Sequence, residues 1–439
     1  MAAGTGIGVG IGSAVFEEDT VTEFSTVKAG ALEILPDSGE KLPVMLVTDG
    51  GVVNDKSFNE QAYEAFYRID SPDVKDGLTE AFYGEESQRY YVQPASSSAD
   101  DVSSQYGTAI ATLGATTVTR IPGNTASTMK KVIIAPGFHH QDAIRVYQEA
   151  NPNCKTKFVV LDAEPKYNNF ATNESTLLKN TYGIQFDTKT AAFQAGYLAA
   201  LYLEAKGDTT PKVGTWGGGN FPGVTDFMVG FVAGIRYYNE HKESGKTAVT
   251  FAKFTADEDY TNSGFAAGDG RVKADHLVSE GADVILPVAG PQTADALAAI
   301  AASNRADEIK AIGVDNDQSK LYTNGDTLLI TSVRKNVRKA SVEGYKAAVG
   351  LPHALGDSVR DSDYDPSSKL YVVGNVGGFT GYVEQHDDTD EVTSGTTWGS
   401  LYDKIRMLSV AEINDAKVTD TVKLADASWT DALAYVKAN

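Results

Sequence analysis

The sequence is poor in the residues that build disulfides and metal sites. Its 439 residues include one cysteine, Cys154, and six histidines. A single cysteine cannot form an internal disulfide, so the cysteine content neither indicates nor excludes secretion into an oxidising compartment. The adjacent pair His139–His140 does not have the spacing of a zinc site such as HExxH. No metal or other cofactor is therefore expected, and Cys154, in the segment NPNCKTKF, is interpreted as a spectator thiol rather than a nucleophile.

Long apolar runs and a surplus of basic residues are absent as well. No run reaches the roughly 18 apolar residues of a membrane helix. The 59 acidic and 38 basic residues give a formal net charge of -21, which argues against nucleic acid or an anionic membrane surface as a partner. A solvated surface accounts for this charge, because the acids are spread along the chain and no ligand-spaced motif supports a cation-binding or salt-adapted surface.

The most informative stretch is VMLVTDGGVVNDKSFN, residues 44–59. It predicts a buried strand at 44–47 that leads to an acid, Asp49, then a glycine turn, and a helix that opens at 57–59. Strand, turn and helix form the first half of a βαβ unit. Ligands of such sheets bind beyond the carboxyl ends of the strands, so we expect the polar groups of this stretch and the ring of Phe58 to face a ligand.

The strand-then-helix pattern continues in two sets of comparable length. Further strands are predicted at 88–93, 132–135, 158–161, 182–186, 212–216, 248–254, 284–288, 309–314 and 328–333. Such units imply parallel sheets with right-handed crossovers, and therefore two α/β lobes with a cleft between them. A late hairpin, from 371–376 and 379–383, and helices near 401–408 and 428–437 are expected to follow.

Six segments, taken together and in order, give the chain a family resemblance. They are VTDGGVVNDKSFNEQAYEAF (47–66), FQAGYLAAL (193–201), VGTWGGGNFPGVTDFMVGFVAG (213–234), GADVILPVAG (281–290), IGVDNDQS (312–319) and TSVRKNV (331–337). Through them the chain resembles the basic membrane protein family of bacterial substrate-binding lipoproteins, whose best-understood members are purine-nucleoside receptors of ABC transporters. The resemblance covers about 44–345 and, more weakly, the rest to about 383.

The resemblance implies a type I periplasmic-binding-protein fold, an α/β fold with two Rossmann-like lobes joined by a three-strand hinge. We expect lobe one at 41–184 with 333–352, and lobe two at 185–332 with most of 365–439. The polar insert at 353–368 and the acidic stretch at 386–393 depart from the compact family pattern.

The first residues of the chain bear on where the protein is found relative to the membrane. Residues 1–40 are expected to form a tail or leader remnant; the first 15, MAAGTGIGVGIGSAV, fit either a piece of a signal or anchor segment or a flexible tail. Family members are usually tethered by an N-terminal lipidated cysteine, whereas Cys154 is internal. The resemblance implies an extracytoplasmic protein that meets the membrane only through its N-terminus. Either the leader was removed and replaced, or residues 1–20 anchor the chain another way.

The same resemblance implies which residues hold a ligand. A purine nucleoside presents a flat base, which stacks on aromatic plates with roughly 1–3 kcal/mol per base, and two ribose hydroxyls, which suit carboxylates and a cation. Phe58 and Phe265 match the plates. Asp315 and Lys335 match the ribose-binding acid and base, and Gly290 offers a close backbone approach.

Four more residues complete the expected site: Asp49, Ser57, Asn59 and Asp142. Asp49 matches the family's strand-end acid, and Asn59 and Asp142 are candidates for the edge of the base. Structural alternatives stay open for all of these assignments. Both phenylalanines could be core or rim rings, Asp49 and Asp315 helix caps, Lys335 a solvated hinge lysine, and Asp142 a first-turn acid that suits the helix dipole.

The favoured function is a receptor that closes on a purine nucleoside (adenosine, guanosine or inosine) and passes it to an ABC transporter permease, with no catalytic activity. Two alternatives stay open. The same fold could bind a sugar or a small signalling ligand as a sensor or surface protein, and absence of the two plates from the cleft would favour that. A nucleoside-processing enzyme is less favoured, because no glycine-rich phosphate loop or metal motif accompanies Asp315 and Asp317.

Overall fold

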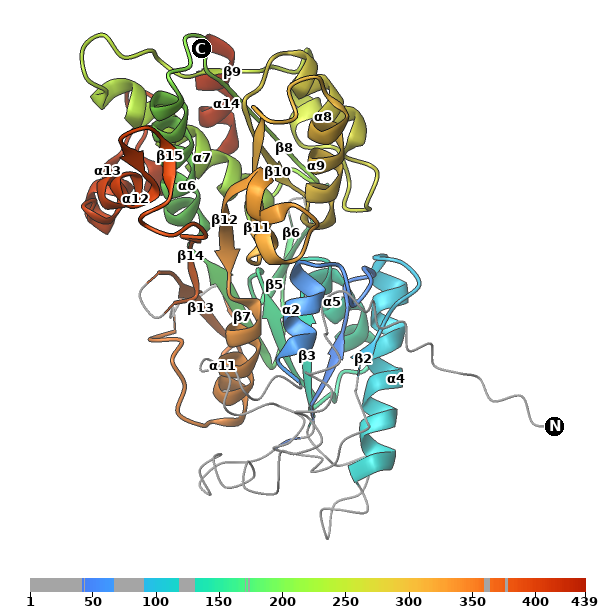
Figure 1. Ribbon diagram of the computed structural model, residues 1–439. Helices are drawn as coiled ribbons and strands as arrows, with labels where there is room; N and C mark the ends of the chain where they lie inside the picture. The colour runs from blue at the N-terminus through green and yellow to red at the C-terminus, as the bar shows by residue number, and fades with distance from the viewer. Residues whose placement is uncertain are drawn as a thin grey trace, which may run out of the picture.

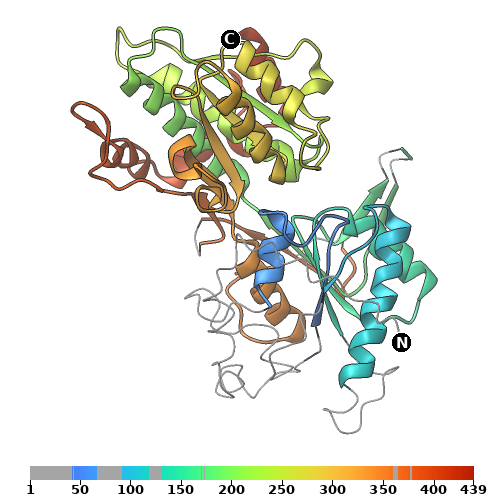
Figure 2. The same cartoon turned by 45° about the vertical axis from the view of Figure 1, so that its right-hand side comes forward.

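The computed structural model describes residues 42, 44–66, 91–117, 131–169, 171–172, 174–358, 364–375 and 378–439. These residues form two six-stranded sheets and two two-stranded ones. Figures 1 and 2 show the two large sheets in separate lobes, each sheet flanked by helices. The leader predicted at 1–40 lies outside the described residues. Among the described helices, none has the length and apolar character that crossing a bilayer requires.

Lobe one is built on the sheet β13-β7-β4-β3-β1-β2, in which every neighbouring pair is parallel. Its strands are β1 (Val44–Val47), β2 (Tyr91–Val92), β3 (Val132–Pro136), β4 (Lys157–Leu161), β7 (Thr181–Phe186) and β13 (Lys369–Val373). The buried sheet residues divide into two clusters, one packed on α2 (Phe58–Glu64) and α11 (Val337–Val349), the other on α4 (Ala99–Thr117) and α5 (His140–Ala150). Both faces are therefore covered, as an all-parallel sheet requires.

Lobe two is built on the sheet β14-β12-β11-β10-β8-β9. Its strands are β8 (Lys212–Gly217), β9 (Thr250–Phe251), β10 (Val284–Val288), β11 (Lys310–Asp315), β12 (Leu329–Lys335) and β14 (Thr380–Tyr382). All pairs are parallel except β12–β14, which is antiparallel. One face is covered by α6 (Thr188–Lys206) and α7 (Pro222–His241), the other by α8 (Arg271–Ser279) and α9 (Thr293–Ala302). The buried Trp216 belongs to this second cluster.

Local sequence signals explain where the long helices begin and end. Pro222 occupies the first position of α7, where its fixed φ suits a helix and its missing N–H costs nothing. Gly207 and Gly350 end α6 and α11 with φ values of 71° and 81°, a left-handed conformation that glycine adopts without a Cβ clash.

The chain passes between the lobes three times, at Asp187 between β7 and α6, at Asn336 between β12 and α11, and between β13 and β14. The predicted two-lobe fold with a three-strand hinge is confirmed. The predicted late hairpin is wrong, because β13 pairs with β7 in the first sheet and β14 pairs with β12 in the second. The residues 369–373, which we assigned to lobe two with 365–439, therefore lie in the sheet of lobe one.

The last part of the chain covers lobe two. Helices α12 (Trp398–Arg406), α13 (Val410–Asp415) and α14 (Trp429–Ala438) share a hydrophobic cluster with α6 and α7. Two small hairpins, β5 (Lys166–Asn169) with β6 (Glu174–Leu177) and β15 (Glu391–Thr393) with β16 (Thr396–Thr397), complete the strands. Short helical segments lie at η2 (Asp257–Tyr260), η3 (Gly290–Gln292), η4 (Gln318–Lys320), α10 (Gly325–Leu328) and η5 (Leu424–Asp426).

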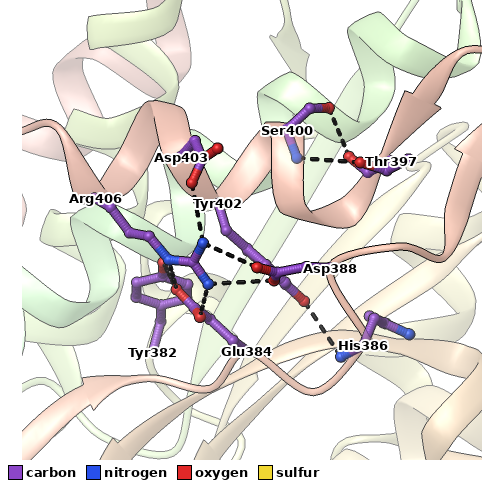
Figure 3. Close-up of polar contacts among 9 residues, drawn as sticks. All are labelled: Tyr382, Glu384, His386, Asp388, Thr397, Ser400, Tyr402, Asp403 and Arg406. Atoms are coloured by element: carbon purple, nitrogen blue, oxygen red, sulfur yellow. Dashed lines mark hydrogen bonds and ion pairs between the residues drawn. The ribbon is translucent and has the colours of Figure 1, made fainter.

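An arginine fastens this C-terminal segment to the loop that follows β14. Figure 3 shows Arg406 of α12 between three carboxylates, Glu384, Asp388 and Asp403. The Asp388 and Asp403 oxygens lie 3.2 and 3.0 Å from the guanidinium. In the same region the His386 backbone N–H donates to the Tyr402 hydroxyl at 3.3 Å. Part of the acidic stretch predicted at 386–393 is thus a structural anchor for α12.

Candidate ligand-binding site

A cavity of about 990 Å³ lies between the lobes. Its walls come from the loops after β1, β3 and β4 in lobe one and after β8, β10 and β11 in lobe two, at the carboxyl ends of parallel strands where such folds bind ligands. Eight of the nine predicted site residues line it: Asp49, Ser57, Phe58, Asn59, Phe265, Gly290, Asp315 and Lys335.

Asp142 is the exception, and its assignment to the base edge is not supported. It lies in the first turn of α5, and its carboxylate accepts the Arg145 guanidinium at 2.7 Å. It is absent from the cavity lining. The structural alternative, a first-turn acid that suits the helix dipole, describes its surroundings.

The loop between β1 and α2 is organised by Asp55. Its carboxylate accepts the backbone N–H groups of Ser57, Asn59 and Glu60 at 2.9, 3.0 and 3.1 Å, which satisfies the free donors at the start of the helix. The Asn59 amide donates to Asp55 and to Asp49, both at 3.0 Å. Asn59 therefore holds Asp49 in place at the cavity wall, and its own buried Oδ1 has no hydrogen-bond partner.

The start of α2 is also hydrogen-bonded to lobe two. The Ser57 hydroxyl donates to Asp315 Oδ2 at 2.5 Å, and the Gln61 amide donates to the Asp315 backbone carbonyl at 2.7 Å. Lys56 Nζ donates to the Leu321 carbonyl at 2.9 Å and lies 4.8 Å from the centre of the Tyr322 ring. Burial raises the pKa of Asp315, while Lys335 and the Ser57 hydroxyl act against this.

Lys335, at the end of β12, is buried, with 1% of its surface exposed. Its Nζ donates to Asp162 Oδ2 of lobe one at 2.7 Å and to the Gly223 carbonyl at 2.8 Å. It also lies 4.6 Å from the centre of the Phe227 ring. The alternative of a solvated hinge lysine is therefore wrong, and Lys335 forms an ion pair between the lobes.

The backbone is strained at three of the residues that line the cavity. Among the described residues, five other than glycine have a left-handed backbone conformation, and three of these, Lys56, Asp162 and Asp315, line the cavity with φ values of 56°, 64° and 65°. Such conformations cost on the order of 1 kcal/mol each and concentrate where a side chain must be held in a set direction. Lys56, Asp162 and Asp315 are also three of the groups that connect the lobes.

Six phenylalanine and tyrosine rings line the cavity, and only two of them, Phe58 and Phe265, were predicted. Phe227 of α7 and Tyr322 are among those that were missed. Phe58 is half-buried at the start of α2, and Phe265 is 40% exposed. Phe138, after β3, and Phe221, before α7, were missed. Both follow glycine-containing turns at strand ends, in GFHH and GGGNFP, so the position was readable, but the sequence alone does not say which rings face each other.

The charge of the lining is unbalanced. Five acids contribute to it, Asp49, Asp55, Asp162, Asp269 and Asp315, against the lysines Lys56 and Lys335. Burial raises the pKa of Asp55 to about 6. Burial also lowers the pKa of His139, against the pull of Asp49. At neutral pH the lining therefore carries more negative than positive charge and suits ligands that donate hydrogen bonds.

Fold and site together define a two-lobed substrate-binding protein with an interlobe ligand cavity. The family model of PnrA-like ABC transporter substrate-binding proteins, Bmp, matches residues 42–350, so the chain belongs to this family. It is a family of binding proteins rather than enzymes.

Individual relatives agree with this. Basic membrane protein D of Borreliella burgdorferi is 28% identical over 54% of this chain and 66% of its own length. The ABC transporter nucleoside-binding protein BmpA of Lactococcus lactis is 27% identical over 57% of this chain and 55% of its own length. The chain thus spans two thirds or less of these relatives. A solved ABC transporter solute-binding protein from Aeropyrum pernix superposes with a TM-score of 0.54 at 18% identity, covering 83% of this chain and 85% of that chain, which supports the fold.

Proposed function

We propose that this protein is an extracytoplasmic receptor that binds a purine nucleoside in the cavity between its lobes and delivers it to an ABC transporter permease. The observation that carries the proposal is the composition of one cavity. It combines an aromatic ring from each lobe, Phe58 and Phe265, with an acid and a cation, Asp315 and Lys335. Attachment to a membrane through residues 1–20 stays a prediction.

The lining offers a partner for each part of a nucleoside. The two rings provide faces for the base, and Asp49 provides an acceptor for N–H groups at its edge. Asp315 and Lys335 provide an acceptor and a donor for the ribose hydroxyls. Gly290 brings its backbone close, since a Cβ at this position would lie 2.9 Å from the Ser57 hydroxyl oxygen.

The net negative lining favours an uncharged ligand. Both lysines already have hydrogen-bond partners in the protein, Lys335 with Asp162 and Gly223 and Lys56 with Leu321. A phosphate group would face several carboxylates, and the charge of Lys335 is already balanced by Asp162. A nucleoside has donors and no formal charge, so it meets the lining without that repulsion.

The first test is isothermal titration of the purified protein with adenosine, guanosine, inosine, uridine and ribose, repeated with Phe58→Ala. We expect a purine nucleoside to bind, and the variant to bind it about 5- to 150-fold more weakly, because one stacking surface is lost. Phe58→Leu keeps apolar volume for the packing of α2 and separates loss of stacking from loss of folding. No binding of any of the five by folded protein, with no nucleoside released on denaturation and detected by mass spectrometry, would overturn the proposal.

A further inference from the structure

Two phenylalanine rings meet across the cavity mouth from opposite lobes. Phe138 follows β3 in lobe one, and Phe221 precedes α7 in lobe two. Their ring centroids lie 3.8 Å apart with 39° between the planes. The row continues in both lobes, because His139 lies 4.0 Å from Phe138 and Phe265 lies 6.0 Å from Phe221.

Both rings are held by turns that leave little freedom. Gly137 has a φ of 105°, and a Cβ there would lie 3.0 Å from Asp49 Oδ2. On the other side, the Phe221 carbonyl accepts the backbone N–H groups of Val224 and Thr225 at 3.0 and 2.9 Å, which fixes Phe221 at the start of α7. Two residues further on, the Gly223 carbonyl accepts a hydrogen bond from Lys335 Nζ. Because each ring is fixed within its own lobe, the distance between the two rings depends on how far apart the lobes lie.

The rings contact each other too closely to form a binding site for a base. A base stacked between two rings needs about twice the separation found here. Phe138 and Phe221 also lie on loops of different lobes. Their contact therefore exists only while the lobes are near each other. It acts on the opening and closing of the cavity rather than on the ligand itself.

We infer that Phe138 and Phe221 form an aromatic clasp that holds the lobes together and slows the release of a bound ligand. The ligand in this inference comes from the proposed function, whereas the contact between the two rings does not depend on it. The clasp is a pair of positioning residues: it stabilises the closed arrangement in which the rings, acids and Lys335 surround the cavity. Its loss raises the rate of opening and leaves the rate of ligand capture by the open protein unchanged.

The test is a double-mutant cycle with Phe138→Leu, Phe221→Leu and the double variant. Release of 2-aminopurine riboside, a fluorescent purine nucleoside, is followed by stopped flow. Each single variant should raise the dissociation rate by about 2- to 12-fold, as expected for one aromatic pair. The double variant should be no faster than the single ones, because either substitution already removes the pair.

Phe254→Leu is the matched control. This half-buried ring contacts Tyr260 and His276, all within lobe two, and does not line the cavity. It should leave the dissociation rate unchanged. Additive effects of the two clasp variants would mean that each ring contacts the ligand separately, and unchanged rates in both would mean that the contact does not hold the lobes. Either result overturns the clasp.

A second readout does not need the ligand. Small-angle X-ray scattering of the unliganded proteins should give a larger radius of gyration for Phe138→Leu/Phe221→Leu than for the wild type and Phe254→Leu, because the lobes open more often. If 2-aminopurine riboside does not bind the wild type, the titrations with the five natural ligands decide the proposed function, while this comparison still decides the clasp. Equal radii in all three proteins would then reject it.

Discussion

At the scale of single residues, Lys335 is a buried cation that links the two lobes at the cavity. It joins Asp162 of lobe one to the end of β12 and influences the carboxyl of Asp315. A buried cation with a carboxylate partner costs desolvation on both sides, so the pair is stable only while both partners are present. The sequence named Lys335 and Asp315 through the family resemblance, but Asp162 became a candidate only when the fold brought it to Lys335, 173 positions along the chain.

Lys335→Met should therefore destabilise the protein at neutral pH by about 3–5 kcal/mol, because Asp162 loses its cation. Adding Asp162→Asn removes the unpaired charge, and the double variant should regain most of the loss. Urea denaturation of the three proteins measures this. Lys320→Met is the control, since this lysine is 81% exposed in a pair with Asp317, and it should change stability by less than about 1 kcal/mol. A double variant as unstable as Lys335→Met would contradict the explanation.

Two buried acids near the cavity predict how stability depends on pH. Burial raises the pKa of Asp55 to about 6 and that of Glu60 to about 7. Between about pH 4 and 7 the folded state holds protons that the unfolded state has already released. The contribution of these two groups to stability is therefore fully present below about pH 4 and is lost as the pH rises to about 7. Glu60 fits this interpretation because its Oε1 is buried without a hydrogen-bond partner.

Glu60→Gln should remove part of this decline, on the order of 1–3 kcal/mol between pH 4.5 and 8. Denaturation curves of the variant and the wild type across this interval test it. Glu174→Gln, at an exposed position of β6, should follow the wild type. The interpretation is wrong if Glu60→Gln declines as steeply as the wild type.

At the scale of elements, α6 and α7 form the most closely packed pair. A Cβ at Gly196 would lie 2.3 Å from the Phe231 carbonyl oxygen, and one at Gly234 would lie 2.2 Å from the Phe193 carbonyl oxygen. Glycine at these positions lets the two backbones approach, which side chains of any size would prevent. The sequence shows the small residues of α6, but it does not show that α7 is the helix against which they pack.

Gly196→Ala should destabilise lobe two by about 1–3 kcal/mol or more, because the backbones must separate to admit the methyl group. The same substitution at Gly107 of α4 provides the control. A Cβ there meets nothing within 4 Å, so the higher helix propensity of alanine should stabilise that helix by up to about 1 kcal/mol. In thermal unfolding, the melting temperature should therefore fall in Gly196→Ala and rise in Gly107→Ala, relative to the wild type. Equal shifts would show that packing does not set the glycine requirement.

Element prediction succeeded where a strand or helix is defined by its own residues. The buried strands β1, β3, β4 and β10 carry continuous apolar runs, and each was predicted to within one residue at its ends. Prediction failed where pairing over long distances decides the structure. The residues 371–376 and 379–383 look like a hairpin, yet each joins a different sheet. The β5–β6 hairpin and α13 are short and weakly apolar, and they were missed.

At the scale of the whole molecule, the two sheets have the same design and meet through loops at their strand ends. Among the described residues, the interlobe contacts include the Lys335–Asp162 ion pair, several hydrogen bonds, a ring pair and a lysine over a tyrosine ring. None of these is large compared with the packing inside each lobe. This balance suits a protein whose lobes must separate and close again while each lobe stays intact. The sequence predicted the two lobes from its strand-then-helix pattern, and the family resemblance added eight residues of the cavity lining.

The third passage between the lobes has a consequence for how the molecule is made. One outer strand of each large sheet, β13 at 369–373 and β14 at 380–382, follows all the other strands of both sheets along the chain. Until the ribosome has passed residue 382, β7 and β12 each keep one edge without its neighbour, and an open edge invites pairing with other chains. Both lobes are therefore completed almost simultaneously, by one short segment of the chain.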